Sequence, residues 1–494
     1  MRDILKMTAI EVGEAIRKGE ITSVEATSAL LDAIEAADSE INAYITVCRE
    51  AALEQAKKVQ KLIESGELSG PLAGVPIAIK DNICTKGVKT SCASKILGDF
   101  KPPYDATVIT RLEEAGMVVV GKLNMDEFAM GSTTETSFYG ATKNPWDKNK
   151  VPGGSSGGAA AAVAAGEAFC ALGSDTGGSI RQPASYCGVT GFKPTYGTVS
   201  RYGLIAYASS LDQIGPVARD VRDCAAIMDI IKGKDCMDGT SIELEEQNES
   251  YLQMLSGDVS KLRVALPKEC FGEGVDDEVR SSVLLMAEEL KKQGAEVTEI
   301  SLPFIKYVIP TYYIMATAEA SSNLSRFDGV KYGFRATEYD GLRDLYEATR
   351  SEGFGEEVKK RILLGTFVLS SGYYDAYYKK ALQVKSIIKE QFDSIFEQYD
   401  VIICPTAPAT APTIGESLSD SLKMYLSDIF TVSPNIAGLP ALSVPCGFDR
   451  SGMPIGAQII GPRLGERNVL GAGYAYQQVT DFHKRNAAER SETK

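Results

Sequence analysis

The sequence predicts an α/β protein with a mixed, mostly parallel central sheet that is flanked by helices on both faces. Two stretches carry this prediction, because each reads as strand, helix, strand. In the first, an apolar run at 75–79 precedes a stretch of helical periodicity at 106–115 and the β-branched run at 118–120. The second has the same order at 262–266, 278–293 and 297–300. Strands that are separated by helices of this length tend to pair in parallel, with the helices packed on the sheet.

Local signals mark where the helices begin and end. Thr8 and Thr22 each start a capping box with a glutamate three residues later, so the first fifty residues are predicted to be helical. Gly116 and Gly294 stand where helices often end in a left-handed cap. Residues 372–399 form a long helical stretch, and the apolar residues 401–404 after it are a predicted strand.

The organisation of the chain gives few boundaries. We expect one domain over residues 1–494, with an N-terminal helical segment at about 1–65 and a smaller inserted lobe within about 215–400. A hydrophobic content of 44% in 494 residues is enough to bury a large core.

Composition excludes several classes of protein. The N-terminus is charged where a signal peptide has its apolar stretch, and no run reaches the ~18 apolar residues of a spanning helix. We therefore expect a cytoplasmic protein that does not bind membranes. The ten cysteines include no Cys-x-x-Cys pair, and His483 is the single histidine, so we expect reduced thiols and no metal site.

The charge balance argues against direct binding of nucleic acid. Lys and Arg number 52 against 66 Asp and Glu, which gives a net charge of −14. A polyanion would be repelled overall. If nucleic acid takes part in the protein's function, we expect a different chain to bind it.

Two clusters of glycine and serine stand out at 152–158 and 173–181. Glycines allow backbone N–H groups to converge, either on a bound phosphate or on a developing oxyanion. A phosphate-binding P-loop also needs a lysine before its Ser or Thr, and neither cluster contains one. Nucleotide binding by these clusters is therefore not expected.

A second interpretation is the nucleophile elbow of histidine-dependent hydrolases. Residues 153–157 match Gly-x-Ser-x-Gly, and His483 lies downstream, as in those enzymes. An elbow needs a buried strand directly before it, whereas 144–152 is polar and contains two prolines. His483 stands beside Lys484 and Arg485, which favours a solvated surface position.

A serine nucleophile without histidine requires another base, and a desolvated neutral lysine can serve. Lys80 ends the apolar run at 75–79, so it is expected at the carboxyl end of a central strand, where the sites of α/β enzymes gather. A surface lysine at a strand end would look the same if Lys80 were considered alone.

Three motifs together resemble the amidase-signature enzymes. They are Gly-Val-Pro-Ile-Ala-Ile-Lys at 74–80, Gly-Gly-Ser-Ser-Gly-Gly at 153–158 and Asp-Thr-Gly-Gly-Ser-Ile-Arg-Gln-Pro at 175–183. The resemblance implies the amidase-signature fold and a triad of Lys80, Ser155 and Ser179, with Ser155 after a cis peptide bond. Lys80 would take a proton from Ser155, and Ser155 would take one from Ser179, whose hydroxyl attacks an amide. Backbone N–H groups of Thr176, Gly177, Gly178 and Ser179 would form the oxyanion hole.

Later segments, at 319–329, 357–362, 371–378 and 428–435, resemble the glutamine-hydrolysing subunits of bacterial aspartyl/glutamyl-tRNA amidotransferases. This implies a glutamine site in which Arg361 binds the α-carboxylate and Asp428 the α-amino group, with Tyr312 or its neighbour Tyr313 as a third contact. It further implies a heterotrimer with B and C subunits. The B subunit would bind most of the misacylated tRNA, and this chain would hold no cofactor, because the partner uses ATP and Mg²⁺ to make Gln-tRNA(Gln) or Asn-tRNA(Asn).

Two other functions are considered beside this one. A stand-alone amidase that acts on small carboxamides would have no use for both Arg361 and Asp428, because a neutral amide carries neither charge. A non-catalytic scaffold would not need intact Lys80, Ser155 and Ser179. The partner subunit, and not this chain, is expected to determine which tRNA is served.

Overall fold

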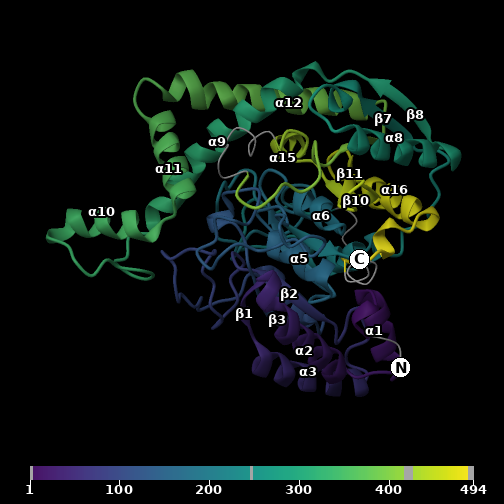
Figure 1. Ribbon diagram of the computed structural model, residues 1–494, viewed down its shortest axis with the longest axis horizontal. Coiled ribbons are helices and arrows are strands. Elements are labelled where there is room, and N and C mark those ends of the chain that lie inside the picture. The colour runs from purple at the N-terminus through teal and green to yellow at the C-terminus, as the bar shows by residue number, and fades with distance from the viewer. Residues whose placement is uncertain (1–3, 245–248, 417–426, 488–494) are drawn as a thin grey trace.

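The computed structural model describes residues 4–244, 249–416 and 427–487. Its centre is one sheet of eleven described strands in the order β1-β3-β2-β4-β6-β5-β10-β11-β9-β7-β8. In Figure 1 the sheet runs from β1, β2 and β3 in the lower part of the molecule to β7 and β8 at the upper right. The predicted α/β class with a mixed sheet is confirmed, but the expected predominance of parallel pairing is not, because six of the ten strand pairings described are antiparallel.

The bounds of the described strands are β1 Tyr44–Val47, β2 Pro76–Lys80, β3 Val118–Leu123, β4 Cys170–Asp175, β5 Thr190–Lys193, β6 Gln213–Ala218, β7 Arg263–Pro267, β8 Glu296–Ile300, β9 Val401–Pro405, β10 Ala441–Phe448 and β11 Pro454–Ile460. The α-helices are α1 Ala9–Arg17, α2 Ser23–Ile41, α3 Arg49–Glu64, α4 Thr107–Glu114, α5 Gly157–Ala165, α6 Arg181–Cys187, α7 Val221–Ile231, α8 Asp277–Lys292, α9 Val308–Asn323, α10 Gly341–Gly353, α11 Glu356–Leu369, α12 Lys379–Phe396, α15 Val432–Ala437 and α16 Glu466–Val479.

Parallel pairing is confined to the two wings of the sheet. β2 pairs in parallel with β3 and β4, and β7 pairs in parallel with β8 and β9. Both strand-helix-strand stretches that the sequence indicated are therefore confirmed. The middle, from β4 through β6, β5, β10 and β11 to β9, is antiparallel and was not anticipated, because its strands are joined by turns and long connections.

The N-terminal helices form as their capping boxes predict. The Thr8 and Thr22 side chains accept hydrogen bonds from the backbone N–H of Glu11 and Glu25, and the two glutamate carboxylates accept the backbone N–H of the threonines in turn. The helical prediction missed one element, since residues 44–47 form the edge strand β1. β1 is short and pairs on one side only, so its alternation carries little signal.

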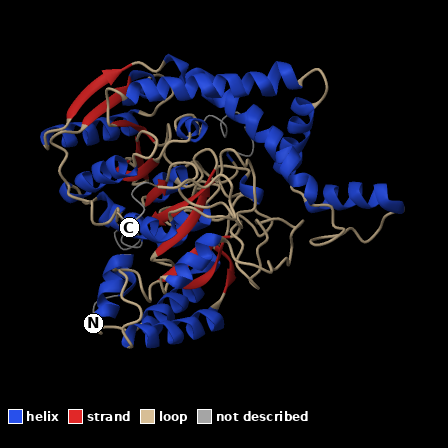
Figure 2. Cartoon of the chain, turned by 180° about the vertical axis from the view of Figure 1, so that it is seen from behind, coloured by secondary structure: helices blue, strands red, loops and turns tan. Residues whose placement is uncertain are grey.

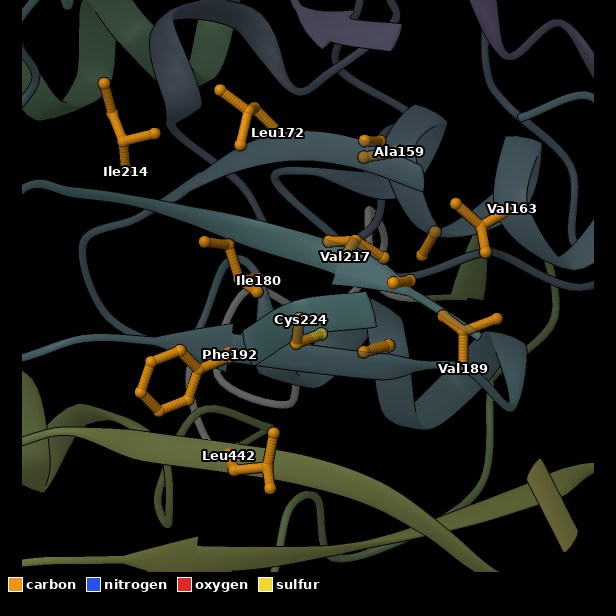
Figure 3. Close-up of a cluster of buried hydrophobic side chains, with 14 of the residues drawn as sticks. Ala159, Val163, Leu172, Ile180, Val189, Phe192, Ile214, Val217, Cys224 and Leu442 are labelled. Atoms are coloured by element: carbon orange, nitrogen blue, oxygen red, sulfur yellow. The ribbon is translucent and has the colours of Figure 1, made fainter. Parts of the chain in front are cut away.

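Helices cover both faces of the sheet. On β10, Leu442 lies beside Gly473 of α16, while the neighbouring Ser443 pairs with Gly191, which faces Ala184 of α6. Successive strand residues point to opposite faces, so α16 and α6 lie on opposite sides. Figure 3 shows the apolar side chains between these layers, among them Ile180, Leu172 and Ile214. This core lies directly beneath the loop that carries Ser179.

An arm of helices projects from the body. α10 extends from one side of the molecule, and α11 joins it to α12 along the top (Figures 1 and 2). The predicted helical stretch at 372–399 is confirmed as α12, preceded by a π-helical turn at Tyr374–Tyr378. The predicted lobe within 215–400 and the organisation as one domain stay predictions.

The ten cysteines are all unpaired thiols, eight of them buried. In the described part of the chain, no group of His, Cys, Asp and Glu side chains is arranged to hold a metal ion. Within the same residues, no helix combines the length and the apolar character that a membrane crossing would take.

Candidate active site

Lys80 is the last residue of β2, and its side chain is fully buried. The Lys80 Nζ lies 2.8 Å from the Ser155 Oγ, 2.8 Å from the Ser156 Oγ and 3.2 Å from the Ser174 carbonyl oxygen. The interpretation of Lys80 as a surface residue is therefore wrong. The parallel strands on both sides of β2 bring this lysine to the interior end of a buried strand, as expected.

Burial sets the protonation of this lysine. Loss of solvent lowers the pKa of Lys80 from 10.5 to about 7, although the negative charges of Asp126, Asp175 and Asp212 act in the opposite direction. A lysine with such a pKa is neutral in a large fraction of molecules at neutral pH. Lys80 can therefore accept a proton, which an ordinary lysine cannot do under these conditions.

Ser155 lies in a loop that is held from several directions. The peptide bond between Gly154 and Ser155 is cis. The Ser155 carbonyl accepts the Asp126 N–H at 3.2 Å, and the Gly154 N–H donates to Gln182 Oε1 at 2.9 Å. Residues 144–156 contain turns and isolated bridges but no strand. The nucleophile-elbow interpretation is therefore wrong, because the element that would strain and expose the serine is missing.

Ser179 lies between β4 and α6, next to the Ser155 loop. Its carbonyl accepts the Ser156 N–H at 3.0 Å, which ties the two glycine-serine clusters together. Ser155 is fully buried, whereas 8% of the Ser179 surface is exposed. Of these two serines, only Ser179 is therefore open to a molecule that arrives from outside.

Asp175, at the end of β4, fixes the loop that carries Ser179. Its carboxylate accepts the N–H groups of Gly178 at 2.8 Å and Ile180 at 3.1 Å, and it receives two bonds of 3.0 Å from Arg181. Burial alone would raise the pKa of Asp175, but the Arg181 guanidinium more than offsets this, so the pKa is lowered. Arg181 also donates to Asn435 and Gln458 from the last part of the chain.

The bond from Gly178 corrects the predicted oxyanion hole. Because the Gly178 N–H donates to Asp175, it supports the loop and does not point freely at a substrate. Thr176 is held through its side chain, which donates to Asp212 at 2.7 Å. The N–H groups of Thr176, Gly177 and Ser179 remain the predicted oxyanion donors.

The glycines of this loop permit close packing. A Cβ on Gly177 would lie 2.6 Å from the Tyr312 ring, and a Cβ on Gly178, at φ +129°, would lie 2.1 Å from the Thr431 Oγ1. The Thr431 hydroxyl donates to the Gly177 carbonyl at 2.7 Å. Larger residues at either position would displace the loop from these neighbours.

Arg361 lies on the inner side of α11 and is buried. Its Nε donates to Glu357 Oε1 at 2.8 Å, and one terminal nitrogen donates to the Tyr207 hydroxyl at 2.8 Å. The guanidinium also lies 5.6 Å from the ring centroids of Tyr207 and Tyr313. Aromatic faces attract such a cation and hold its plane, so these contacts orient the guanidinium.

Asp428 lies just before the short helix α15. Its Oδ2 accepts the Ser132 hydroxyl at 3.0 Å. Burial among protein atoms raises the pKa of Asp428 to about 7, and the positive charge of Arg361 opposes this rise. Asp428 and Arg361 are thus close enough to interact, and each carries the charge opposite to one end of a free amino acid.

The structure distinguishes Tyr312 from Tyr313. The Tyr312 ring is buried and packs on Gly177, whereas Tyr313 is partly exposed and lies against Arg361. The two rings are 5.0 Å apart and nearly perpendicular. Tyr312 is therefore the tyrosine that faces the Ser179 loop.

His483 differs from its predicted solvated position. The side chain is partly buried, and its Nδ1 has no hydrogen-bond partner among the described residues. Burial and the neighbouring Lys484 lower the pKa of His483 to about 4. It lines a cavity of about 300 Å³ with Trp146 and Arg219, and none of Lys80, Ser155 and Ser179 lines that cavity.

Sequence reasoning missed several supporting residues. Ser156 shares Lys80 with Ser155, Asp212 holds Thr176, and Tyr207 holds Arg361. Ser156 lies inside the glycine-serine cluster at 152–158, so the sequence already indicated that it is close to the site. Tyr207 and Asp212 come from a loop with no distinctive pattern, and only the fold brings them to the site.

Comparison with known proteins identifies relatives along nearly the whole chain. The sequence profile of the amidase family matches residues 25–470. A protein from Lachnospira eligens, named as the A subunit of glutamyl-tRNA(Gln) amidotransferase, is 61% identical over 476 residues, which are 96% of this chain and 98% of that protein. A protein of the same name from Moorella thermoacetica is 55% identical over 483 residues, 98% of each chain.

Solved structures show the same relationship. The crystal structure of the glutamyl-tRNA(Gln) amidotransferase A subunit from Thermotoga maritima is 42% identical, with a TM-score of 0.79 over 97% of this chain and 96% of that one. The native peptide amidase from Stenotrophomonas maltophilia is 29% identical, with a TM-score of 0.78 over 96% of each chain.

Proposed function

Because the chain belongs to the amidase family, we propose that it hydrolyses the side-chain amide of glutamine at Ser179 and supplies the ammonia to a partner subunit. The observation that carries this proposal is the buried contact of 2.8 Å between the Lys80 Nζ and the Ser155 Oγ. A lysine with a pKa of about 7 in that position serves as the base for a serine nucleophile.

The reaction begins with proton transfer along the triad. Neutral Lys80 accepts the Ser155 proton while Ser155 accepts the proton of Ser179. The Ser179 oxygen bonds to the amide carbon of glutamine, and the carbonyl oxygen takes up the negative charge. The N–H groups of Thr176, Gly177 and Ser179 stabilise this oxyanion.

Two steps complete the turnover. As the carbon–nitrogen bond breaks, the proton returns through Ser155 to the leaving nitrogen, and ammonia departs from a glutamyl ester on Ser179. Water then attacks the ester, with the Lys80–Ser155 pair as base, and releases glutamate.

The charged pair selects the substrate. Arg361 binds the α-carboxylate of glutamine and Asp428 binds its α-ammonium group, while Tyr312 closes the site over Gly177. A bound ammonium group also favours the ionised form of Asp428, whose pKa of about 7 lies close to neutral pH. A stand-alone amidase for small carboxamides is the weaker candidate because a neutral amide gains nothing from this pair.

The proposal extends to the assembly. The relatives with more than half of their residues identical are named as A subunits of an amidotransferase. We therefore propose that this chain works with B and C subunits, and that the B subunit binds misacylated tRNA and uses ATP and Mg²⁺. The net charge of −14 supports such a division of labour, because it disfavours tRNA binding by this chain.

One experiment tests both halves. In a complex reconstituted with the B and C subunits, Ser179→Ala should abolish amidation of misacylated tRNA with glutamine and retain it with ammonium salt and ATP. Hydroxylamine should intercept the glutamyl ester of the wild-type protein and release it as γ-glutamyl hydroxamate, and the variant should form none. Hydroxamate formed by Ser179→Ala would show that another residue is the nucleophile. Failure of ammonium to rescue an assembled complex would contradict the separate ammonia source.

A further inference from the structure

Residues 126–132, here called the anchor segment, touch three parts of the site. The Asp126 N–H donates to the Ser155 carbonyl at 3.2 Å. Six residues later, the Ser132 hydroxyl donates to Asp428 at 3.0 Å. Between them, Glu127 turns the other way and contacts the start of α11. One short segment thus joins the relay serine, the aspartate of the substrate pair and the helix that carries Arg361.

Glu127 is a buried carboxylate with two partners. Its Oε2 accepts the Gly355 N–H at 2.8 Å, and its Oε1 accepts the Ser94 hydroxyl. Gly355 precedes α11, and a Cβ at Gly355 would lie 2.3 Å from the Glu127 Oε2. Glycine at 355 therefore allows the carboxylate to meet the helix end directly.

The backbone of the anchor segment is held in an uncommon shape. Phe128 and Ala129 have positive φ angles of 50° and 61°, which residues other than glycine rarely adopt. The Phe128 ring packs on Phe354, 5.7 Å away between centroids. Packing by Phe128 and hydrogen bonding by Glu127 thus bind the same junction between α10 and α11.

A second contact holds α11 farther along. A Cβ at Gly365 would lie 1.9 Å from the Thr317 carbonyl oxygen, so α11 and α9 touch closely at this point. Arg361 lies between this contact and Gly355. If the helix pivots about Gly365, Arg361 moves about 0.4 Å for each 1 Å at Gly355, since helical rise is proportional to residue number.

We propose that Glu127 is a positioning residue that fixes the start of α11 against the anchor segment, and so sets the distance between Arg361 and the Ser155–Ser179 pair. The inference rests on the proposed function, because it assigns Arg361 to the α-carboxylate of glutamine. Glutamine would be held at its α-carboxylate by Arg361 of α11. The Glu127 carboxylate links the start of that helix to the anchor segment, which contacts the Ser155 loop. A misplacement well under 1 Å at Arg361 is then enough to weaken glutamine binding.

Three variants separate positioning by hydrogen bonds from an effect of charge. Glu127→Gln keeps the length and can still accept the Gly355 N–H while its NH₂ group faces Ser94. Glu127→Asp keeps the charge but is one carbon shorter, and Glu127→Ala removes both. We expect the KM for glutamine to rise about tenfold in Glu127→Asp and Glu127→Ala and less than about threefold in Glu127→Gln. The kcat of all three variants should stay within about threefold of the wild-type value. The reverse order, with Asp near wild type and Gln impaired, would overturn the proposal.

A double-mutant cycle tests whether Glu127 acts through Arg361. Glu127→Ala should raise the KM for glutamine in the wild-type background and have no further effect in Arg361→Ala, because the group that it positions is gone. Additive effects would mean that Glu127 acts independently of Arg361, which contradicts the inference. Thermal melting of each variant identifies unfolding, and Glu127→Asp, which is also expected to raise the KM about tenfold, takes the place of Glu127→Ala in the cycle if Glu127→Ala does not fold.

Asp229→Ala is the matched control. Asp229 likewise accepts a serine hydroxyl, from Ser250 at 2.6 Å, and a backbone N–H, from Tyr251 at 2.7 Å, but it lies on α7, away from the triad and the substrate pair. The KM of Asp229→Ala for glutamine should equal the wild-type value. If the wild-type protein releases no glutamate from glutamine, the proposed function fails. If wild type is active and the cycle is additive, only the role of Glu127 fails.

Discussion

Glutamine hydrolysis should decline steeply on the acidic side of pH 7, because two groups must lose a proton. Lys80 must be neutral to act as a base, and burial lowers its pKa from 10.5 to about 7. Asp428 must be ionised to bind the ammonium group of the substrate, and burial raises its pKa from 3.8 to about 7. Both pKa values therefore lie near 7, although burial lowers the pKa of Lys80 and raises that of Asp428.

The two kinetic parameters separate these groups. kcat reports the substrate complex, in which the bound ammonium group keeps Asp428 ionised, so Lys80 is the one of these two groups that still titrates there. About one molecule in ten then has neutral Lys80 at pH 6, and kcat falls toward tenfold per pH unit below that. kcat/KM reports the free enzyme, in which both groups titrate, and its limiting fall is about a hundredfold per pH unit.

The assay measures glutamate release from about pH 5.5 to 9 at saturating and at low glutamine. Asp428→Asn provides the control, since its kcat/KM should be low at every pH and should follow a single proton on the acidic side. A kcat that stays constant down to pH 5.5, or that rises only above about pH 9, would refute the role of Lys80 as a buried neutral base.

Three substitutions extend these expectations. Lys80→Met preserves bulk and removes the base, so glutamine turnover should be nearly abolished, and a normal rate would place the base elsewhere. His483→Ala should change the rate by less than about twofold, because positions away from functional features usually matter little and this one is remote from the triad. A loss of several hundredfold would restore a histidine-dependent mechanism. Arg361→Ala should impair glutamine far more than an uncharged primary amide, when kcat/KM is measured for both; equal losses would assign Arg361 a structural role.

The wings of the sheet were predictable because their strands are hydrophobic and separated by helices with clear caps. The apolar run before Lys80 and the helical stretch before Gly116 indicated both the type of each element and the order of the elements along the chain. The antiparallel middle was not, since it depends on the pairing of β5 with β10, which lies far later in the sequence. Periodicity describes each strand by itself and says nothing about which distant strand it pairs with.

The candidate triad came from motifs that resemble those of the amidase-signature enzymes, whereas the residues that support it could not be predicted from the sequence. Lys80, Ser155 and Ser179 lie in patterns that recur in a family. Glu127 and Tyr207 are each hydrogen-bonded to a residue far along the chain, Gly355 and Arg361, and no local sequence pattern indicates such bonds. The Gly178 N–H shows the same limit, because only the structure reveals that Asp175 has already engaged it.

The central place of β10 and β11 affects when activity can appear during protein synthesis. Lys80, Ser155 and Ser179 emerge from the ribosome in the first two-fifths of the chain, long before residues 441–460. Until those residues arrive, β5 lacks its neighbour β10, and Arg181 lacks the side chains of Asn435 and Gln458. A stalled or truncated chain therefore carries every group of the triad without the scaffold that aligns them. We therefore expect unfinished copies of the chain to leave glutamine unhydrolysed.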